Sequence, residues 1–227
     1  MAGVCGAASA ASAAPRSNLE IEFPHPVISE VLFHVPPGNA GDANGDGSRD
    51  AAGDEFIEIV NPHDRPIPIG GYVLSDKPNS DGCAQLRFVF PPCRLEPGQC
   101  AVVFNGHRST IPGPVGTDQA APAGPNESFG GALVFTMGNA SENAALGNGG
   151  DFVLLTAPDG TALDAVIWGF PSRVPPTETL RVMLAVPDPG GSVARRGAGG
   201  EITAHVFLDG RSFSPGVWLG EGGGEGQ

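Results

Sequence analysis

The chain has 227 residues and a formal net charge of -13 at pH 7, with 12 Lys and Arg against 25 Asp and Glu. This balance argues against binding to the nucleic-acid backbone, which depends on clustered basic residues. The 35 Gly and 23 Pro separate short apolar clusters, a pattern that indicates many strands joined by many turns. No run of about 18 apolar residues is present, so we expect no membrane span.

The two ends of the chain differ in composition from its centre. Residues 1–24 begin with an Ala/Ser-rich run that resembles the small-residue end of a secretory signal but lacks a basic start and a strong apolar stretch. We interpret them as a flexible segment or the remnant of a signal region. Residues 219–227 are rich in Gly and read as a flexible tail. Residues 25–218 are left as one domain.

The first predicted strand, residues 27–33, leads into an acidic loop at residues 42–55. Oxygen-bearing side chains recur there at alternate positions around Gly47, which is the donor order of a calcium loop. The twelfth position is Gly53, so the closing carboxylate would come from one of the next two residues. No flanking helix is readable, which predicts a Ca²⁺ loop set in a β scaffold. The predicted metal ligands are Asp42, Asn44, Asp46, Ser48, Asp50, Asp54 and Glu55.

Five carboxylates within this one loop would repel one another unless a cation neutralised them. We therefore expect Ca²⁺ as the cofactor of the domain. The alternative is that the loop is a solvated acidic turn that binds no ion.

The remaining strands are predicted from alternation and from short apolar runs between Gly and Pro. They cover residues 56–61, 67–76, 86–90, 100–104, 132–135, 151–156, 162–168, 179–186 and 202–208. Pro158-Asp159-Gly160 between two apolar runs is a hairpin signal. Residues 105–130 form a long irregular loop, a candidate for function or for disorder. No helical periodicity is found, so the fold class is all-β: a two-sheet β-sandwich with long glycine/proline-rich loops.

The histidines and serines of the chain do not occur at the spacings of known catalytic motifs. The five histidines are scattered without a zinc-site pattern, and no G-x-S-x-G sequence marks a nucleophilic serine. Cys93 and Cys100 are either bridged, if the chain is exported, or two separate thiols. Trp168 and Trp218 belong either to the core or to a binding platform.

Several motifs, in order, resemble the bacterial lamin-tail domain. They are DEFIEIVNP at 54–62, IGGYVLSD at 69–76, FVFPP at 88–92, LEPGQCAVVF at 95–104 and GDFVLL at 150–155. GSVARR at 191–196 and SPG at 214–216 resemble its closing elements, so the resemblance covers about residues 26–217. It implies an immunoglobulin-like fold without recognised catalytic residues, found mostly in exported or surface proteins.

We therefore expect a non-catalytic, calcium-stabilised, extracytoplasmic module for binding, adhesion or assembly. Its expected partner is a protein or a cell-surface or matrix component, with carbohydrate as a second class and nucleic acid disfavoured by charge. Two alternatives stay open. The chain could be, or accompany, a metal-dependent hydrolase or nuclease, or it could be a nucleic-acid-binding module.

Overall fold

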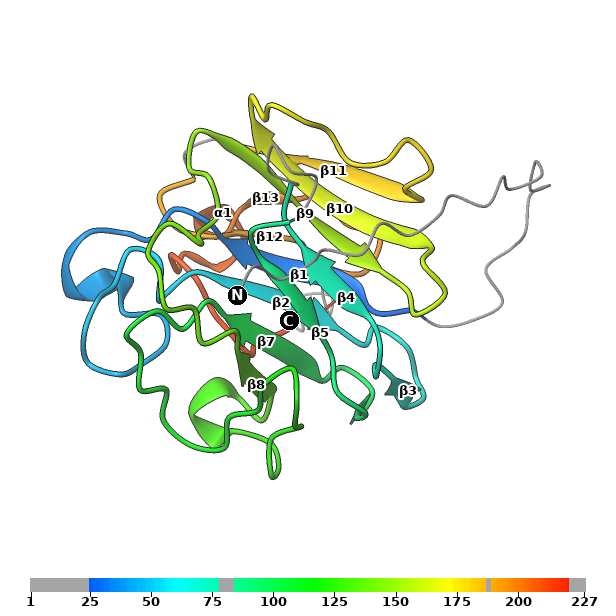
Figure 1. The fold of residues 1–227 in the computed structure, drawn as a ribbon, viewed down its shortest axis with the longest axis horizontal. Coiled ribbons are helices and arrows are strands. Elements are labelled where there is room, and N and C mark those ends of the chain that lie inside the picture. Colours follow the sequence, from blue (N-terminus) through cyan, green and yellow to red (C-terminus); the bar gives the residue numbers. More distant parts are fainter. Residues whose placement is uncertain (1–24, 78–83, 187–188, 221–227) are drawn as a thin grey trace, which may run out of the picture.

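The computed structural model of the chain describes residues 25–77, 84–186 and 189–220. The predicted N-terminal segment and most of the predicted tail lie outside these residues. Two β-sheets pack face to face, which confirms the predicted two-sheet immunoglobulin-like sandwich (Figure 1). No helix in the described part of the chain is long and apolar enough to cross a membrane.

One sheet has six strands in the order β13-β12-β1-β2-β7-β8. Their bounds are β1 Val27–Leu32, β2 Phe56–Val60, β7 Cys100–Phe104, β8 Leu133–Thr136, β12 Val193–Ala194 and β13 Thr203–Ala204. The other sheet has five strands in the order β11-β10-β9-β4-β5. Their bounds are β4 Val73–Ser75, β5 Arg87–Val89, β9 Gly150–Thr156, β10 Ala162–Gly169 and β11 Arg181–Ala185. Among the described residues, β3 (Ile67–Pro68) pairs only with β6 (Arg94–Leu95), as expected for a strand containing proline.

The main core lies between the two sheets and is formed by alternate residues of their strands. Trp168 of β10 stacks on Phe33 with ring centroids 4.1 Å apart, and its indole N–H donates to the Gly147 carbonyl. Trp168 is therefore a core residue. The predicted hairpin at 158–160 joins β9 to β10, which pair antiparallel along their length.

A second apolar layer covers the outer face of the six-stranded sheet. Phe56, Val102, Phe104 and Val134 point to this face and are fully buried or nearly so. Phe129, in the 3-10 helix η2 (Glu127–Phe129), packs on them from the long loop, and Trp218 packs on them from the chain end. The loop at residues 105–130 is thus an ordered cover of the sheet (Figure 1).

One predicted strand is wrong. Residues 202–208 form only β13 and then a short helix, α1 (Val206–Asp209), which ends at Gly210 with φ +83°. The helical turn brings Asp209 to the ring of His205 four residues earlier, a contact that an extended strand would not make. A second short 3-10 helix, η1 (Gly38–Gly41), precedes the acidic loop.

Cys93 and Cys100 are both free thiols. Cys93 packs at the edge of the main core, whereas Cys100 belongs to the layer on the outer face of the six-stranded sheet. A sheet therefore separates the two thiols, which is why the predicted turn between them does not bring them together.

Candidate functional site

The first half of the acidic loop brings three predicted ligands together. The Asp42 carboxylate and the Asn44 side-chain oxygen both accept the backbone N–H of Asp46, at 3.2 and 3.0 Å. Asp42 also accepts the N–H of Gly47 at 2.9 Å. Gly45 and Gly47 have positive φ, +70° and +89°, so the chain turns sharply around these oxygens.

Asp46 also joins the acidic loop to the loop at residues 105–130. One carboxylate oxygen of Asp46 accepts the N–H of Thr110 at 3.0 Å, and the other accepts the N–H of Ser48 at 2.9 Å. The amide group of Asn44 donates to the Ser109 hydroxyl at 2.9 Å. The two loops are therefore held side by side.

The second half of the loop uses its acids differently. Asp54 is fully buried and accepts three backbone N–H groups, those of Ala43, Asn44 and Asp50, at 2.6 to 2.9 Å. Burial nevertheless raises its pKa. Glu55 is buried at the end of the sandwich, where it accepts the Leu146 N–H, and burial raises its pKa well above the usual range. Both side chains hold the backbone in place.

Asp50 differs from the other acids of the loop because it is the partner of His107. Its carboxylate lies 3.2 Å from His107 Nδ1 and accepts the N–H groups of Ala52 and Gly53. Partial burial opposes ionisation, but the hydrogen bonds from Gly53 and His107 prevail and lower the pKa of Asp50. A Cβ at Gly53 would lie 2.2 Å from the His107 carbonyl oxygen, which excludes a closing carboxylate at the twelfth position.

The predicted seven ligands are therefore not gathered around one point. Asp42, Asn44 and Asp46 converge, whereas Asp50, Asp54 and Glu55 are directed to other partners and Ser48 is exposed. In the described ranges no three His, Cys, Asp or Glu side chains form a group able to hold a metal. Ca²⁺ at this loop would depend on Asp42 and Asp46 with Asn44, backbone carbonyls and water, all hard oxygen donors that suit this ion.

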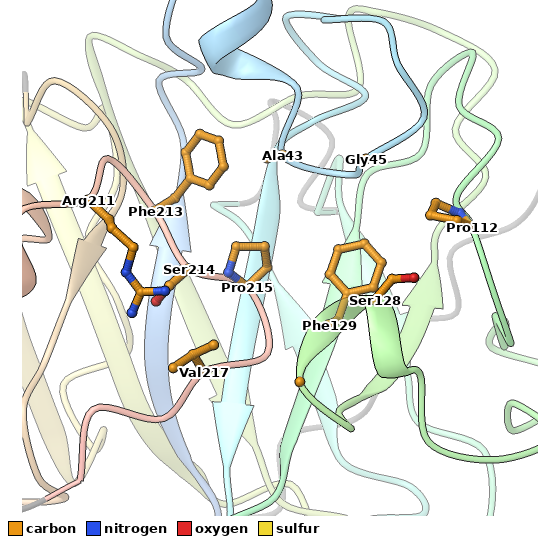
Figure 2. A pocket seen from close by; sticks show the side chains of 11 residues that line it. Ala43, Gly45, Pro112, Ser128, Phe129, Arg211, Phe213, Ser214, Pro215 and Val217 are labelled. Carbon is orange, nitrogen blue, oxygen red and sulfur yellow. The ribbon is translucent and has the colours of Figure 1, made fainter.

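A pocket of about 420 Å³ opens beside the acidic loop. Ala43 and Gly45 of that loop form one side, and Pro112 and Phe129 of the neighbouring loop form the next (Figure 2). The chain segment at residues 211–217 closes the remaining side with Arg211, Phe213, Ser214, Pro215 and Val217. Aromatic rings, prolines and one arginine give the pocket a mixed polar and apolar lining.

Two buried carboxylates lie on the sheet behind this pocket. Glu30 of β1 and Glu58 of β2 are directly opposite in the strand register and are 2% and 0% exposed. Glu58 accepts the Ser29 hydroxyl and the Gly216 N–H, each at 2.6 Å. Burial, together with the neighbouring Glu30, raises the pKa of Glu58 to about 8. Glu58 is therefore protonated near neutral pH.

Glu30 binds the segment that lines the pocket. It accepts the Ser192 hydroxyl at 2.6 Å and the Ser214 N–H at 2.9 Å, and it lies 3.2 Å from His205 Nδ1. His205 Nε2 lies 3.1 Å from Asp209, although neither ring contact has the geometry of a linear hydrogen bond. Burial opposes charging of the imidazole, but the Glu30 and Asp209 carboxylates raise the pKa of His205. The cluster anchors residues 192–216 to the six-stranded sheet.

The sequence of β1 and β2 contains no sign that Glu30 and Glu58 are buried. What buries them is the covering loop and the segment at 211–217, which are distant in sequence. The serine hydroxyls point to Glu30 and not to His205, so this cluster does not hold the serine–histidine pair of a nucleophilic site.

Comparison with known families agrees with this architecture. The model of the family described as Lamin Tail Domain matches residues 24–170. No match was found among curated proteins. The matched residues run from β1 to the end of β10 and include the acidic loop, whereas β11, β12, β13 and α1 follow the matched part. The match spans more than half of the sequence, and the chain therefore belongs to the lamin tail domain family.

Proposed function

We propose that this chain is a non-catalytic module for binding or assembly outside the cytoplasm, and that Ca²⁺ stabilises its acidic loop. The observation that supports the proposal best is the place of that loop in a lamin-tail domain. The converging oxygens of Asp42, Asn44 and Asp46 lie directly beside the pocket wall made by Ala43 and Gly45. An ion that orders the loop would therefore also shape the pocket.

Asp42, Asn44 and Asp46 would hold the ion. Ca²⁺ supplies positive charge that reduces the repulsion between the two aspartates, and it accepts irregular oxygen geometry on a flexible, glycine-rich backbone. Calcium modules of extracellular proteins have dissociation constants of about 0.1 to 1 mM, so such a site fills only where calcium is abundant. This supports an extracytoplasmic setting.

The pocket supports a protein or a cell-surface component as the partner, with carbohydrate as the second class. Phe129 and Phe213 provide ring surface, and Arg211 offers hydrogen-bond donors at the rim. Nucleic acid is disfavoured because the chain carries a net charge of -13.

Thermal unfolding with millimolar Ca²⁺, Mg²⁺ or chelator tests the calcium proposal. Ca²⁺ at a hundredfold excess over its dissociation constant should add roughly 2.7 kcal/mol to the free energy of unfolding. Mg²⁺ should substitute poorly because it prefers six tight octahedral contacts. Asp46→Ala should abolish the difference between calcium and chelator, whereas Asp118→Ala, at an exposed acid outside the loop, should keep it.

Identical unfolding curves in all three solutions would show that the loop is a solvated acidic turn. The same samples should be assayed with nuclease, phosphatase and glycosidase substrates. Turnover that disappears in Asp46→Ala would overturn the non-catalytic assignment.

A further inference from the structure

The strand β11 is an open edge of the five-stranded sheet. It pairs in parallel with β10, from Asp164↔Arg181 to Trp168↔Ala185, and has no second neighbour among the described residues. The Leu180 N–H donates to the Ala162 carbonyl, toward β10. Alternation along the strand then directs the backbone groups of Arg181, Met183 and Ala185 away from β10, toward the open edge.

The side chains of this strand are apolar on the face turned to solvent. Met183 and Ala185 pack against the main core, whereas the alternate residues Leu180, Val182, Leu184 and Val186 are exposed. Phe170 directly follows β10, whose last pair with β11 is Trp168↔Ala185, and is 97% exposed. Most of the exposed large apolar side chains in the described residues belong to β11 and to the connection that leads into it.

The exposed residues of β11, Val182 and Leu184, are neither charged nor proline. Edge strands normally carry charges, prolines or bulges that prevent pairing with another chain. The charged side chain within β11, that of Arg181, is turned inward, where it donates to Asp164 at 3.1 Å and to the Ala198 carbonyl at 2.6 Å. The register of β11 with β10 also has no irregularity.

The sequence of the strand is complementary to itself. A two-fold axis at Met183 would place Val182 opposite Leu184 of a second copy, and Leu180 opposite Val186. Every exposed position would then face an apolar residue. The same axis pairs Arg181 with Ala185, so no like charges face each other, and all three outward-pointing residues obtain backbone partners.

We propose that two copies of this chain associate through β11, antiparallel, so that their five-stranded sheets become one continuous sheet. Val182 and Leu184 of the strand, together with Leu180, Val186 and Phe170 next to it, are 41 to 97% exposed and contribute apolar surface toward the roughly 800 Å² per partner of a standard interface. A charged partner would find no complementary charge on this strand. A second copy supplies both the apolar face and the backbone pairing.

Molar mass over a dilution series from sub-millimolar to low micromolar protein tests the proposal, by light scattering after size exclusion. The wild-type chain should reach twice its 23.0 kDa mass at the upper concentrations. Leu184→Lys should stay monomeric or weaken association by about tenfold or more. Phe207→Lys is the matched control, because Phe207 is 79% exposed on α1 and Leu184 is 77% exposed on β11. It should dimerise like the wild type.

Hydrogen exchange locates the interface independently of any variant. The amides of Arg181, Met183 and Ala185 should gain protection as the protein concentration rises. The gain should persist in chelator, because β11 lies at the edge of the five-stranded sheet, apart from the acidic loop (Figure 1). Higher salt should strengthen the dimer by screening the repulsion between two chains of charge -13. A wild-type chain that is monomeric throughout, a Leu184→Lys variant that dimerises unchanged, or protection gained elsewhere would overturn the proposal.

Discussion

The outer faces of the two sheets are built in opposite ways. The outer face of the six-stranded sheet carries two buried glutamates among its apolar residues and is covered by the loop at 105–130 and the segment at 211–217. The outer face of the five-stranded sheet is apolar and exposed at β11. The covered face contains polar groups that fix its cover in one position, whereas the exposed side chains of β11, Val182 and Leu184, are apolar.

The difference shows how this chain attaches irregular segments to a sheet. Apolar contacts alone would let a glycine- and proline-rich segment settle in several positions. Glu30 and Glu58 specify one position because each accepts backbone or hydroxyl hydrogens from segments distant in sequence, including Ser214 and Gly216. A strand whose exposed side chains are apolar, such as β11, specifies a face for association without fixing a loop of its own chain.

Of the changes considered, removing the Glu30 side chain should destabilise the covered face of the six-stranded sheet most. Glu30→Ala would leave the buried Ser214 N–H without its acceptor and the Ser192 hydroxyl with only its longer contact to the Ser212 carbonyl, and it would remove the carboxylate beside His205. We expect a loss of about 3 to 5 kcal/mol in the free energy of unfolding, measured by urea titration at pH 7.

Glu30→Gln keeps the size and one acceptor oxygen and should cost less than Glu30→Ala. Equal stability of Glu30→Ala and the wild type would mean that the cover does not depend on this cluster.

The titration of Glu58 should make the covered face sensitive to alkaline pH. Its pKa is about 8 in the folded chain, against a usual 4.5, so the folded chain binds the extra proton and stability declines as pH rises between these values. The stabilisation is complete below pH 4.5 and is lost as pH passes 8. We expect the wild type to lose roughly 2 to 4 kcal/mol between pH 6 and pH 9 through this group.

Glu58→Gln cannot ionise and should lose less stability over the same interval, as measured by urea unfolding at both pH values. Glu96→Gln alters an exposed glutamate and should retain the wild-type pH dependence. If Glu58→Gln and the wild type show the same dependence on pH, Glu58 does not titrate in this range.

A matched pair of valines compares the two faces directly. Val102 of β7 is 0% exposed beneath the covering loop, whereas Val182 of β11 is 47% exposed. Val102→Ala should lose about 2 kcal/mol of unfolding free energy, because it leaves a cavity. Val182→Ala should change it by less than about 0.5 kcal/mol in dilute, monomeric protein. Similar losses would mean that β11 is covered in solution.

Most strands were predictable because their signals are local. The short apolar runs at residues 56–61 and 100–104 predicted β2 and β7, and the Pro-Asp-Gly turn predicted the β9–β10 hairpin. The strand prediction for residues 202–208 was wrong because their apolar residues suit a short strand. The turn at His205 depends instead on contacts with Asp209 and Glu30. The predicted acidic loop lies in the connection between β1 and β2, but its spacing did not indicate that Asp50, Asp54 and Glu55 bind different partners.

The sequence by itself determined the all-β class, the lamin-tail family and the position of the acidic loop. These three features depend on side-chain periodicity, turn residues and short motifs, all of which involve residues close together in the sequence. Only the tertiary structure decided that Asp54 and Glu55 support the backbone, that Glu30 and Glu58 share a buried site, and that β11 is left uncovered. Each of these depends on which distant segment covers a face, and burial, in turn, changes what a carboxylate or an apolar residue does there.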